Sequence, residues 1–189
     1  MNNKIETNII GYVHTDLPEK FGVPRQSGLV NELSGYISIL PPYNQKEAFN
    51  GLLDYDYIWI LFHFHKAVRN DKTFYATVKP PRLGGNVHKG VFATRSPFRP
   101  NNIGLSSVKL ERIEFNEDST KIYIKGADLI DGTPVIDIKP YLPYTDSHKD
   151  AKAGFADSII NYQLTVSYDK DMLNIIPGEK QKALIKLLE

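Results

Sequence analysis

The sequence predicts a mainly β protein whose strands form a barrel or a sandwich, followed by a short α/β appendage at the C-terminus. Short runs rich in β-branched and aromatic residues recur along most of the chain, which is typical of half-buried strands. Prolines and glycines separate these runs, and helical periodicity is weak until the C-terminal segment. Long helices do not alternate with the strands, which argues against a doubly wound nucleotide-binding fold.

The expected strands follow one another along the chain. Ile9–His14 opens the series as a short β run, and Gly35–Leu40 alternates in polarity until two prolines end it. Tyr55–His65 combines aromatic and β-branched residues, as a long buried strand requires. The further strand candidates are Phe74–Lys79, Gly90–Thr94, Gly104–Phe115, Lys121–Gly126, Val135–Lys139 and Tyr162–Tyr168.

Helical patterns are short and few. Gln45–Leu52 predicts two turns that stop at Gly51. Near the C-terminus, Asp169–Ile176 and Glu179–Glu189 predict two short helices, the second with leucines at helical spacing. These segments are too short to provide a helical layer against the strands, so the predicted class stays mainly β.

The chain has 189 residues, a length that suits one ordinary domain with an appendage and can bury a core. A polar, loop-like segment, Tyr144–Gly154, indicates where the two parts divide. We therefore expect a β-barrel domain over residues 1–150 and a short extension over residues 151–189 with one strand and two short helices.

Composition excludes several classes of protein. There is no cysteine, so a disulfide scaffold, a cysteine nucleophile, a thiolate zinc site and an iron–sulfur cluster are excluded. The longest apolar stretch, Tyr57–Phe64, is far shorter than the roughly 20 residues that span a bilayer. The N-terminus has no apolar segment typical of a secretory signal. We expect a cytoplasmic protein that does not insert into a membrane.

Charge is unevenly distributed although the net charge is only +1. The stretch from Lys72 to Leu110 contains no Asp or Glu but seven Lys and Arg residues. Aromatic residues lie between these cations, at Phe74, Tyr75, Phe92 and Phe98. Base stacking combined with phosphate pairing would suit RNA. The alternative is a set of strands with solvated lysines and a packed aromatic face.

A donor-rich loop lies within this basic stretch. Pro97 and Pro100 fix the backbone, so the loop that follows Gly90–Thr94 is expected to be ordered. It carries four side chains with hydrogen-bond donors, at Arg95, Ser96, Arg99 and Asn101. Such loops suit the recognition of anions or nucleotides. The alternative is a plain turn whose arginines face water.

A second cluster combines carboxylates with a lysine. Asp131 precedes Gly132 and predicts a turn, and Asp137 and Lys139 share one face of the strand that follows. With Asp128, these residues are a candidate acid–base cluster. In the alternative interpretation, Asp128 and Asp131 only brace turns.

Two further features are weaker. His63 and His65 share one strand face, so a metal site is conceivable, but no third ligand follows from the spacing. Arg25 and Gln26 form a polar pair after a proline on a stiff turn. The glycines after Pro80 lack the spacing of phosphate-binding loops.

In this order, five segments resemble the TsaA-like proteins, tRNA adenine-N6 methyltransferases that act on threonylcarbamoyladenosine at position 37. The segments are Pro-Arg-Gln, Tyr-Ile-Trp-Ile-Leu-Phe-His-Phe-His, Pro-Pro-Arg, Gly-Val-Phe-Ala-Thr-Arg-Ser-Pro-Phe-Arg-Pro-Asn and Asp-Gly-Thr-Pro-Val-Ile-Asp-Ile-Lys-Pro-Tyr. The resemblance covers residues 6–146. Its last two segments are long and specific.

The resemblance implies a β-barrel, unlike the Rossmann-type methyltransferases. It implies that S-adenosylmethionine is the methyl donor, bound near a homodimer interface, and that the substrate is tRNA carrying threonylcarbamoyladenosine. Larger members continue into a domain with an Asp-Pro-Arg-Pro motif, which this sequence does not contain. If that motif seats the tRNA, we expect this chain to bind tRNA differently.

The candidate residues lie in the segments that carry the resemblance. As groups that accept the N6 proton, we take Asp137 and His65 as the catalytic candidates, with Asp131 behind them because a turn Asp often binds its own backbone. The cofactor-binding candidates are Arg25, Gln26, His65, Arg95, Ser96, Asp131 and Thr133. The substrate-binding candidates are Arg82, Arg95, Arg99, Asn101, Lys139, Tyr141 and Tyr144. Arg95 or Arg99 would pair with the threonyl carboxylate, because guanidinium offers two parallel donors.

Two other functions remain as alternatives. A β-barrel RNA-binding module without enzymatic activity would bind RNA in a salt-sensitive way and show no affinity for the cofactor. A metal-dependent hydrolase would use His63, His65 and an aspartate and would contain a metal. No Gly-x-Ser-x-Gly segment supports a serine hydrolase.

Overall fold

The computed structural model describes residues 3–67, 73–117, 119–157, 167 and 170–188. The chain divides into two compact units that interleave along the sequence. The first unit comprises Met1–Lys66 and Asn102–Tyr141, and the second comprises Ala67–Asn101 and Leu142–Glu189. The expected domain boundary at residue 150 stays a prediction, and each unit is described by itself.

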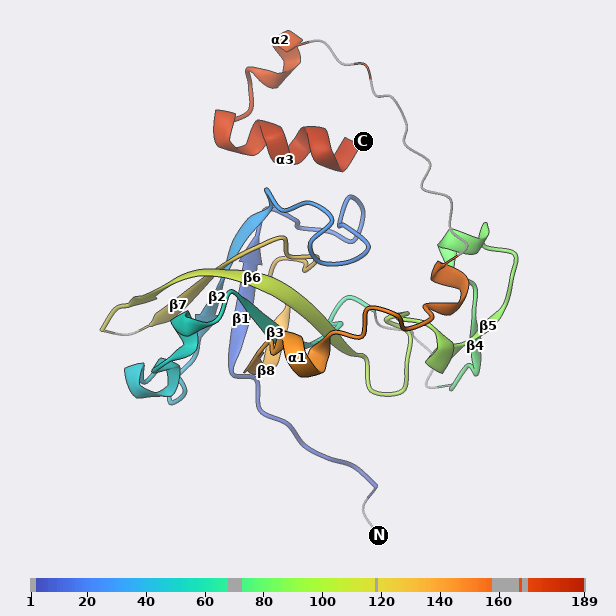
Figure 1. The fold of residues 1–189 in the computed structure, drawn as a ribbon, viewed down its shortest axis with the longest axis horizontal. Coiled ribbons are helices and arrows are strands. Elements are labelled where there is room, and N and C mark those ends of the chain that lie inside the picture. The colour runs from blue at the N-terminus through green and yellow to red at the C-terminus, as the bar shows by residue number, and fades with distance from the viewer. Residues whose placement is uncertain (1–2, 68–72, 118, 158–166, 168–169, 189) are drawn as a thin grey trace. The chain divides into compact units, whose positions relative to one another are not determined.

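The first unit is a closed barrel of antiparallel strands (Figure 1). Around the barrel the strands follow the order β1-β2-β7-β6-β3-β8. Their bounds are Gly11–Thr15 for β1, Ser34–Ile39 for β2, Tyr57–His63 for β3, Ile103–Phe115 for β6, Thr120–Lys125 for β7 and Pro134–Pro140 for β8. The structure therefore confirms the predicted mainly β class. Of the two predicted architectures, it shows the barrel and not the sandwich.

The core lies inside this barrel and follows from alternation along the strands. In β7, every second residue from Thr120 to Ile124 is buried, and in β3 the buried residues are Ile58, Ile60 and Phe62. Gly104 in β6 lies opposite Phe62, where an added Cβ would come within 2.2 Å of the ring. The glycine thus makes room for the aromatic ring that lies within the buried core.

An irregularity in the pairing of β3 with β8 sets which side chains of β8 face outward. Leu61 pairs with Asp137, but its neighbour Phe62 pairs with Val135, so Ile136 is an extra residue in β8. Because of this bulge, Val135 is fully buried and Ile138 also packs against the core. Asp137 and Lys139 then lie on the opposite face, as predicted, and form an ion pair of 2.8 Å.

The second unit contains little regular structure. Phe74–Lys79 was expected as a strand, but β4 is Thr77–Val78, paired with β5, Lys89–Gly90. The expected strand Gly90–Thr94 is wrong beyond Gly90, because Thr94 donates from both its backbone nitrogen and its hydroxyl to the Val91 carbonyl and closes a 3₁₀ turn. Among the described residues of this unit, the helices are η3 (Pro81–Leu83), η4 (Val91–Ala93, the turn that Thr94 closes), α1 (Pro143–Asp146), η5 (Gly154–Ala156), α2 (Lys170–Leu173) and α3 (Gly178–Leu188).

The predicted helical segments agree with the structure in place and differ in type or length. Gln45–Leu52 contains the 3₁₀ helix η1 (Lys46–Phe49), and Gly51 separates it from η2 (Leu52–Asp54) with a left-handed φ of 80°. The strand expected over residues 162–168 lies almost entirely outside the described residues. Among the helices that the structure describes, none is long and apolar enough to cross a membrane.

Candidate functional site

Three segments of the barrel unit meet around Asp131. They are the chain that leaves β1 (Thr15–Pro18), the turn before β8 (Leu129–Thr133) and the end of β3 (His63–Lys66). The backbone nitrogen of Asp131 donates to the Leu17 carbonyl at 2.8 Å, and the Lys66 ammonium donates to the Pro18 carbonyl. We call this set the Asp131 site.

The turn before β8 is built from its own sequence. Gly132 has a φ of 74°, a conformation that favours glycine, and its nitrogen donates to Val13 in β1 at 2.8 Å. Thr133 is buried and donates from its hydroxyl and its backbone nitrogen to the Ile130 carbonyl, at 2.6 and 3.2 Å. Thr133 therefore closes the turn that presents the carboxylate of Asp131.

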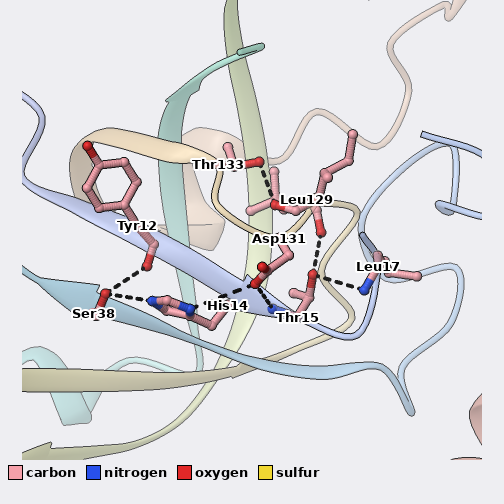
Figure 2. A network of polar contacts seen from close by, with 9 residues as sticks. Tyr12, His14, Thr15, Leu17, Ser38, Leu129, Asp131 and Thr133 are labelled. Atoms are coloured by element: carbon pink, nitrogen blue, oxygen red, sulfur yellow. Dashed lines mark hydrogen bonds and ion pairs between the residues drawn. The ribbon is translucent and has the colours of Figure 1, made fainter. Parts of the chain in front are cut away.

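The Asp131 carboxylate is held while half of its side chain stays exposed. Its Oδ1 accepts a hydrogen bond from the backbone nitrogen of Thr15 at 3.1 Å, and the same oxygen lies 3.8 Å from Nδ1 of His14 (Figure 2). The side chain is 49% exposed. A carboxylate in this arrangement can face a cationic ligand, since solvent-accessible space remains on its outer side.

His14 is itself fixed from two sides. Its Nε2 hydrogen-bonds with the Ser38 hydroxyl at 2.8 Å, and its ring stacks on Tyr36 with centroids 4.6 Å apart. The Ser38 hydroxyl also donates to the Tyr12 carbonyl at 3.4 Å (Figure 2). The imidazole therefore has one orientation in which its other nitrogen points toward Asp131.

His65 lies just after the end of β3. Partial burial lowers the pKa of its imidazole, and the charges of Lys66 and His63 lower it further. Asp131 is close enough to oppose this shift and raise the pKa of His65. Because the net pKa shift is downward, the imidazole is neutral at pH 7 and can accept a proton.

Three of the predicted residues thus belong to the Asp131 site of the barrel unit: Thr133 closes the turn that carries Asp131, and the charge of Asp131 acts on His65. Arg25 and Gln26 lie in the loop between β1 and β2, where the Gln26 amide donates to the Arg25 carbonyl. Arg25 is exposed. Their predicted contact with a cofactor stays a prediction.

Asp137 has different surroundings from Asp131. Its Oδ1 accepts from its own strand neighbour Ile138 at 2.9 Å, and Oδ2 pairs with Lys139. It also lines a cavity of about 500 Å³ together with residues of η1 and η2, among them Phe49 and Leu52. Its assignment as a base stays a prediction, and no contact of the described residues joins it to Asp131.

Tyr141 lies at the end of β8. Its backbone nitrogen donates to Tyr57 at 3.0 Å, and its ring lies 5.4 Å from that of Trp59. Lys139 extends into solvent from the same strand. Both residues were predicted to contact the substrate, and that role stays a prediction.

The remaining predicted residues belong to the second unit. Thr94 organises the loop that carries them: its carbonyl accepts from Nη1 of Arg99 at 3.1 Å, and its hydroxyl accepts from the nitrogen of Ser96 at 3.3 Å. The Ser96 hydroxyl in turn accepts from the nitrogen of Phe98. The loop is therefore ordered, as its prolines predict. Arg82, Arg95, Asn101 and Tyr144 are exposed.

Sequence reasoning missed the residues that hold the Asp131 site together: His14, Thr15, Ser38 and Lys66. His14 and Ser38 lie on neighbouring strands whose register is not visible in the sequence. Lys66 directly follows a predicted residue, and that adjacency was the one available signal.

Metal ligation finds no support in the described part of the chain. No group of three or more His, Cys, Asp or Glu residues among the described residues could hold a metal ion. His63 is exposed at the end of β3 and lies beside Phe64 and His65 without a third ligand of this kind. Among the described residues, therefore, no metal-binding cluster supports the alternative of a metal-dependent hydrolase.

Comparison with known proteins identifies the family. Residues 12–147 match the family described as "tRNA-methyltransferase O N-terminal domain". The chain is 46% identical over 163 residues to the tRNA (adenine(37)-N6)-methyltransferase of Escherichia coli, covering 86% of this chain and 68% of that protein. It is 47% identical over 149 residues to RcsF of Pseudomonas aeruginosa, a protein whose name assigns it to the S-adenosylmethionine-dependent methyltransferases.

That second match covers 79% of this chain and 62% of RcsF, so the chain spans about two thirds of the length of these relatives. Among solved structures, TrmO from Pseudomonas aeruginosa superimposes with a TM-score of 0.78 at 33% identity, covering 98% of this chain and 81% of that one. The family match includes the Asp131 site and all six barrel strands apart from Gly11, the first residue of β1. The chain belongs to the TrmO family, as its resemblance to the TsaA-like proteins implied.

Proposed function

We propose that this chain transfers a methyl group from S-adenosylmethionine to N6 of adenine 37 in tRNA. The observation that carries the proposal is the 46% identity to a tRNA (adenine(37)-N6)-methyltransferase over 86% of the chain. The family match over residues 12–147 includes the three segments that build the Asp131 site. We also propose that the tRNA carries a threonylcarbamoyl group on that adenine, and that the protein works in the cytoplasm, where it meets tRNA.

The donor set of the Asp131 site fits S-adenosylmethionine. A half-exposed carboxylate suits a ligand with a positive sulfonium or ammonium group, and Asp131 supplies one on a rigid turn. The Lys66 ammonium and the neutral His65 lie on the adjoining segment. When bound, the cofactor supplies an electrophilic methyl group. Asp131, Thr133 and His65 would hold it, with Arg25 and Gln26 from the loop after β1. The cofactor contacts predicted for Arg95 and Ser96, which belong to the second unit, stay predictions.

His65 is the residue we propose as proton acceptor. The N6 atom of the threonylcarbamoyl adenine bears one hydrogen that must leave as a proton when the methyl group arrives, so a nearby group that can accept a proton is required. The lowered pKa keeps the imidazole of His65 unprotonated at neutral pH. The negative charge of Asp131 stabilises the imidazolium that forms, while alignment of the two reactants provides most of the rate. Asp137 remains the second candidate.

S-adenosylmethionine binding separates this proposal from the RNA-binding module. We expect the cofactor at 100 times its Kd to stabilise the protein by about 2.7 kcal/mol, a rise in Tm of roughly 5–10 °C at this size. Calorimetry and thermal shift on the full chain measure it, with S-adenosylhomocysteine as a second ligand. A folded protein that binds RNA and neither ligand would favour the module.

The pH dependence of methyl transfer tests His65. Activity needs the neutral imidazole, so it should fall as the pH drops through the lowered pKa, below the usual value of about 6.5. Asp131 raises that pKa, so Asp131→Asn should move the acid limb of kcat to still lower pH. His65→Asn should abolish the limb. An acid limb that persists in His65→Asn would exclude His65 as the group that titrates.

The loop arginines are proposed to read the threonyl carboxylate. Arg99 is braced by Thr94, and a guanidinium binds a carboxylate through two parallel hydrogen bonds that lysine cannot reproduce. Arg99→Lys should raise the KM for modified tRNA by about tenfold, with little change in S-adenosylmethionine Kd. Steady-state kinetics with modified and unmodified tRNA provide the comparison. If the variant weakened S-adenosylmethionine binding as much as it raised the KM for tRNA, the assignment would be contradicted.

We propose a homodimer that forms through the outward face of β3 and its neighbours. Leu61 lies directly opposite Leu105, which is 52% exposed, and Trp59 and Ile103 extend the same apolar face. Monomeric proteins rarely leave a contiguous apolar patch of this kind in water. Leu105→Asp should therefore give a monomer in sedimentation velocity. Leu53→Asp, an exposed leucine on η2, is the control and should leave a dimer. A wild-type monomer would refute the proposal.

A further inference from the structure

A second outward face of the barrel carries a continuous row of aromatic and cationic side chains. His14 stacks on Tyr36 with ring planes 19° apart, and Tyr36 lies 5.6 Å from Tyr123. The guanidinium of Arg112 lies 3.5 Å from the centroid of the Tyr123 ring. The ammonium of Lys121 lies 5.0 Å from the Tyr36 ring. We call these five residues the aromatic–cationic face.

Strand register creates this row. His14 in β1 pairs with Tyr36 in β2, Tyr36 pairs with Tyr123 in β7, and Tyr123 pairs with Arg112 in β6. The neighbours of these residues along each strand, such as Val13 and Ile37, are buried in the core. The row therefore points outward on four adjacent strands, across about 14 Å. That width corresponds to about four stacked nucleotides at 3.4 Å each.

The chemistry of the row suits RNA better than protein. Rings give stacking surfaces that accept any base, and lysine and arginine pair with phosphates. The row contains no aliphatic side chain, in contrast to the leucine-rich face of β3 and β6. Arg112 is 53% exposed although Glu114 holds it. Both Glu114 oxygens are used within the face, one by Arg112 Nε at 3.0 Å and one by the Tyr123 hydroxyl at 2.8 Å.

The row also begins at the candidate site. His14, its first member, lies 3.8 Å from Asp131 through the nitrogen that does not contact Ser38. An RNA strand that places one base at the Asp131 site would therefore lead its neighbouring nucleotides onto Tyr36, Tyr123 and Arg112. We propose that the aromatic–cationic face binds the anticodon-loop nucleotides that flank adenine 37. The identity of this RNA rests on the proposed function.

Binding of a fluorescent 17-nucleotide anticodon stem-loop to the full chain tests the proposal by anisotropy over a range of salt concentrations. Lys121→Ala should weaken binding several-fold and reduce the slope of log K against log salt by about one, because one phosphate contact is lost. Tyr36→Leu should weaken binding about tenfold, and Tyr36→Phe should bind like the wild type, since the ring stays.

Lys46→Ala is the matched control. Lys46 also lies over an aromatic ring, 5.6 Å from Phe115, but it belongs to η1 outside the face, so its loss should leave Kd and salt slope unchanged. If Lys121→Ala behaves like Lys46→Ala, or if the wild type does not bind the stem-loop, the proposal is overturned. If the Tyr36→Leu variant does not fold, the stem-loop affinity and salt slope of Lys121→Ala alone decide whether the proposal holds.

A separate methylation assay keeps this result distinct from the proposed function. If the wild type methylates tRNA and the face variants keep its KM and Kd, only the inference about the face fails. If the wild type binds the stem-loop through the face but methylates no tRNA, the face stands as an RNA-binding surface and the methyltransferase proposal fails.

Discussion

Closure of the barrel between β1 and β8 is the constraint on which the rest of this unit depends. The two strands share a very short register, Gly11 with Val135 and Tyr12 with Pro134. The hydrogen bonds then continue past the end of the sheet, from Val13 to the Thr133 carbonyl and from Gly132 to the Val13 carbonyl. The hydrogen bonds that close the barrel are therefore continuous with those that shape the turn carrying Asp131. For this reason, the Asp131 site requires the closed barrel.

Much of the barrel follows from the sequence because alternation in polarity is a local property. All six barrel strands were predicted within two residues of their observed ends. The bulge at Ile136 and the pairing of His14 with Tyr36 were not predictable, since register depends on distant strands. The strand predicted over Gly90–Thr94 was wrong for a local reason. The hydroxyl of Thr94 donates to the Val91 carbonyl, which a strand would use for pairing.

The same limit applies to the candidate site. Asp131 and Thr133 were predicted as parts of a turn motif, and the structure brings them together with His65 because β3 also borders β8 around the barrel. His14 and Ser38 carried no motif, so their part in orienting Asp131 became visible only with the strand pairs in place. Arg95 and Arg99 share a motif with each other but belong to the second unit, and no sequence pattern relates them to Asp131.

The way in which Asp131 is held explains how a small turn can serve a charged ligand. Backbone groups fix the turn, and the Thr133 hydroxyl closes it, so side chains of the core are not needed to position the carboxylate. Asp131 accepts only a backbone bond from Thr15 among its described hydrogen bonds, and its side chain stays half-exposed. A carboxylate that is oriented before a ligand arrives loses little entropy on binding, and its charge acts where the protein has already placed it. Rigid positioning of this kind matters most for methyl transfer, where alignment rather than covalent catalysis provides the rate.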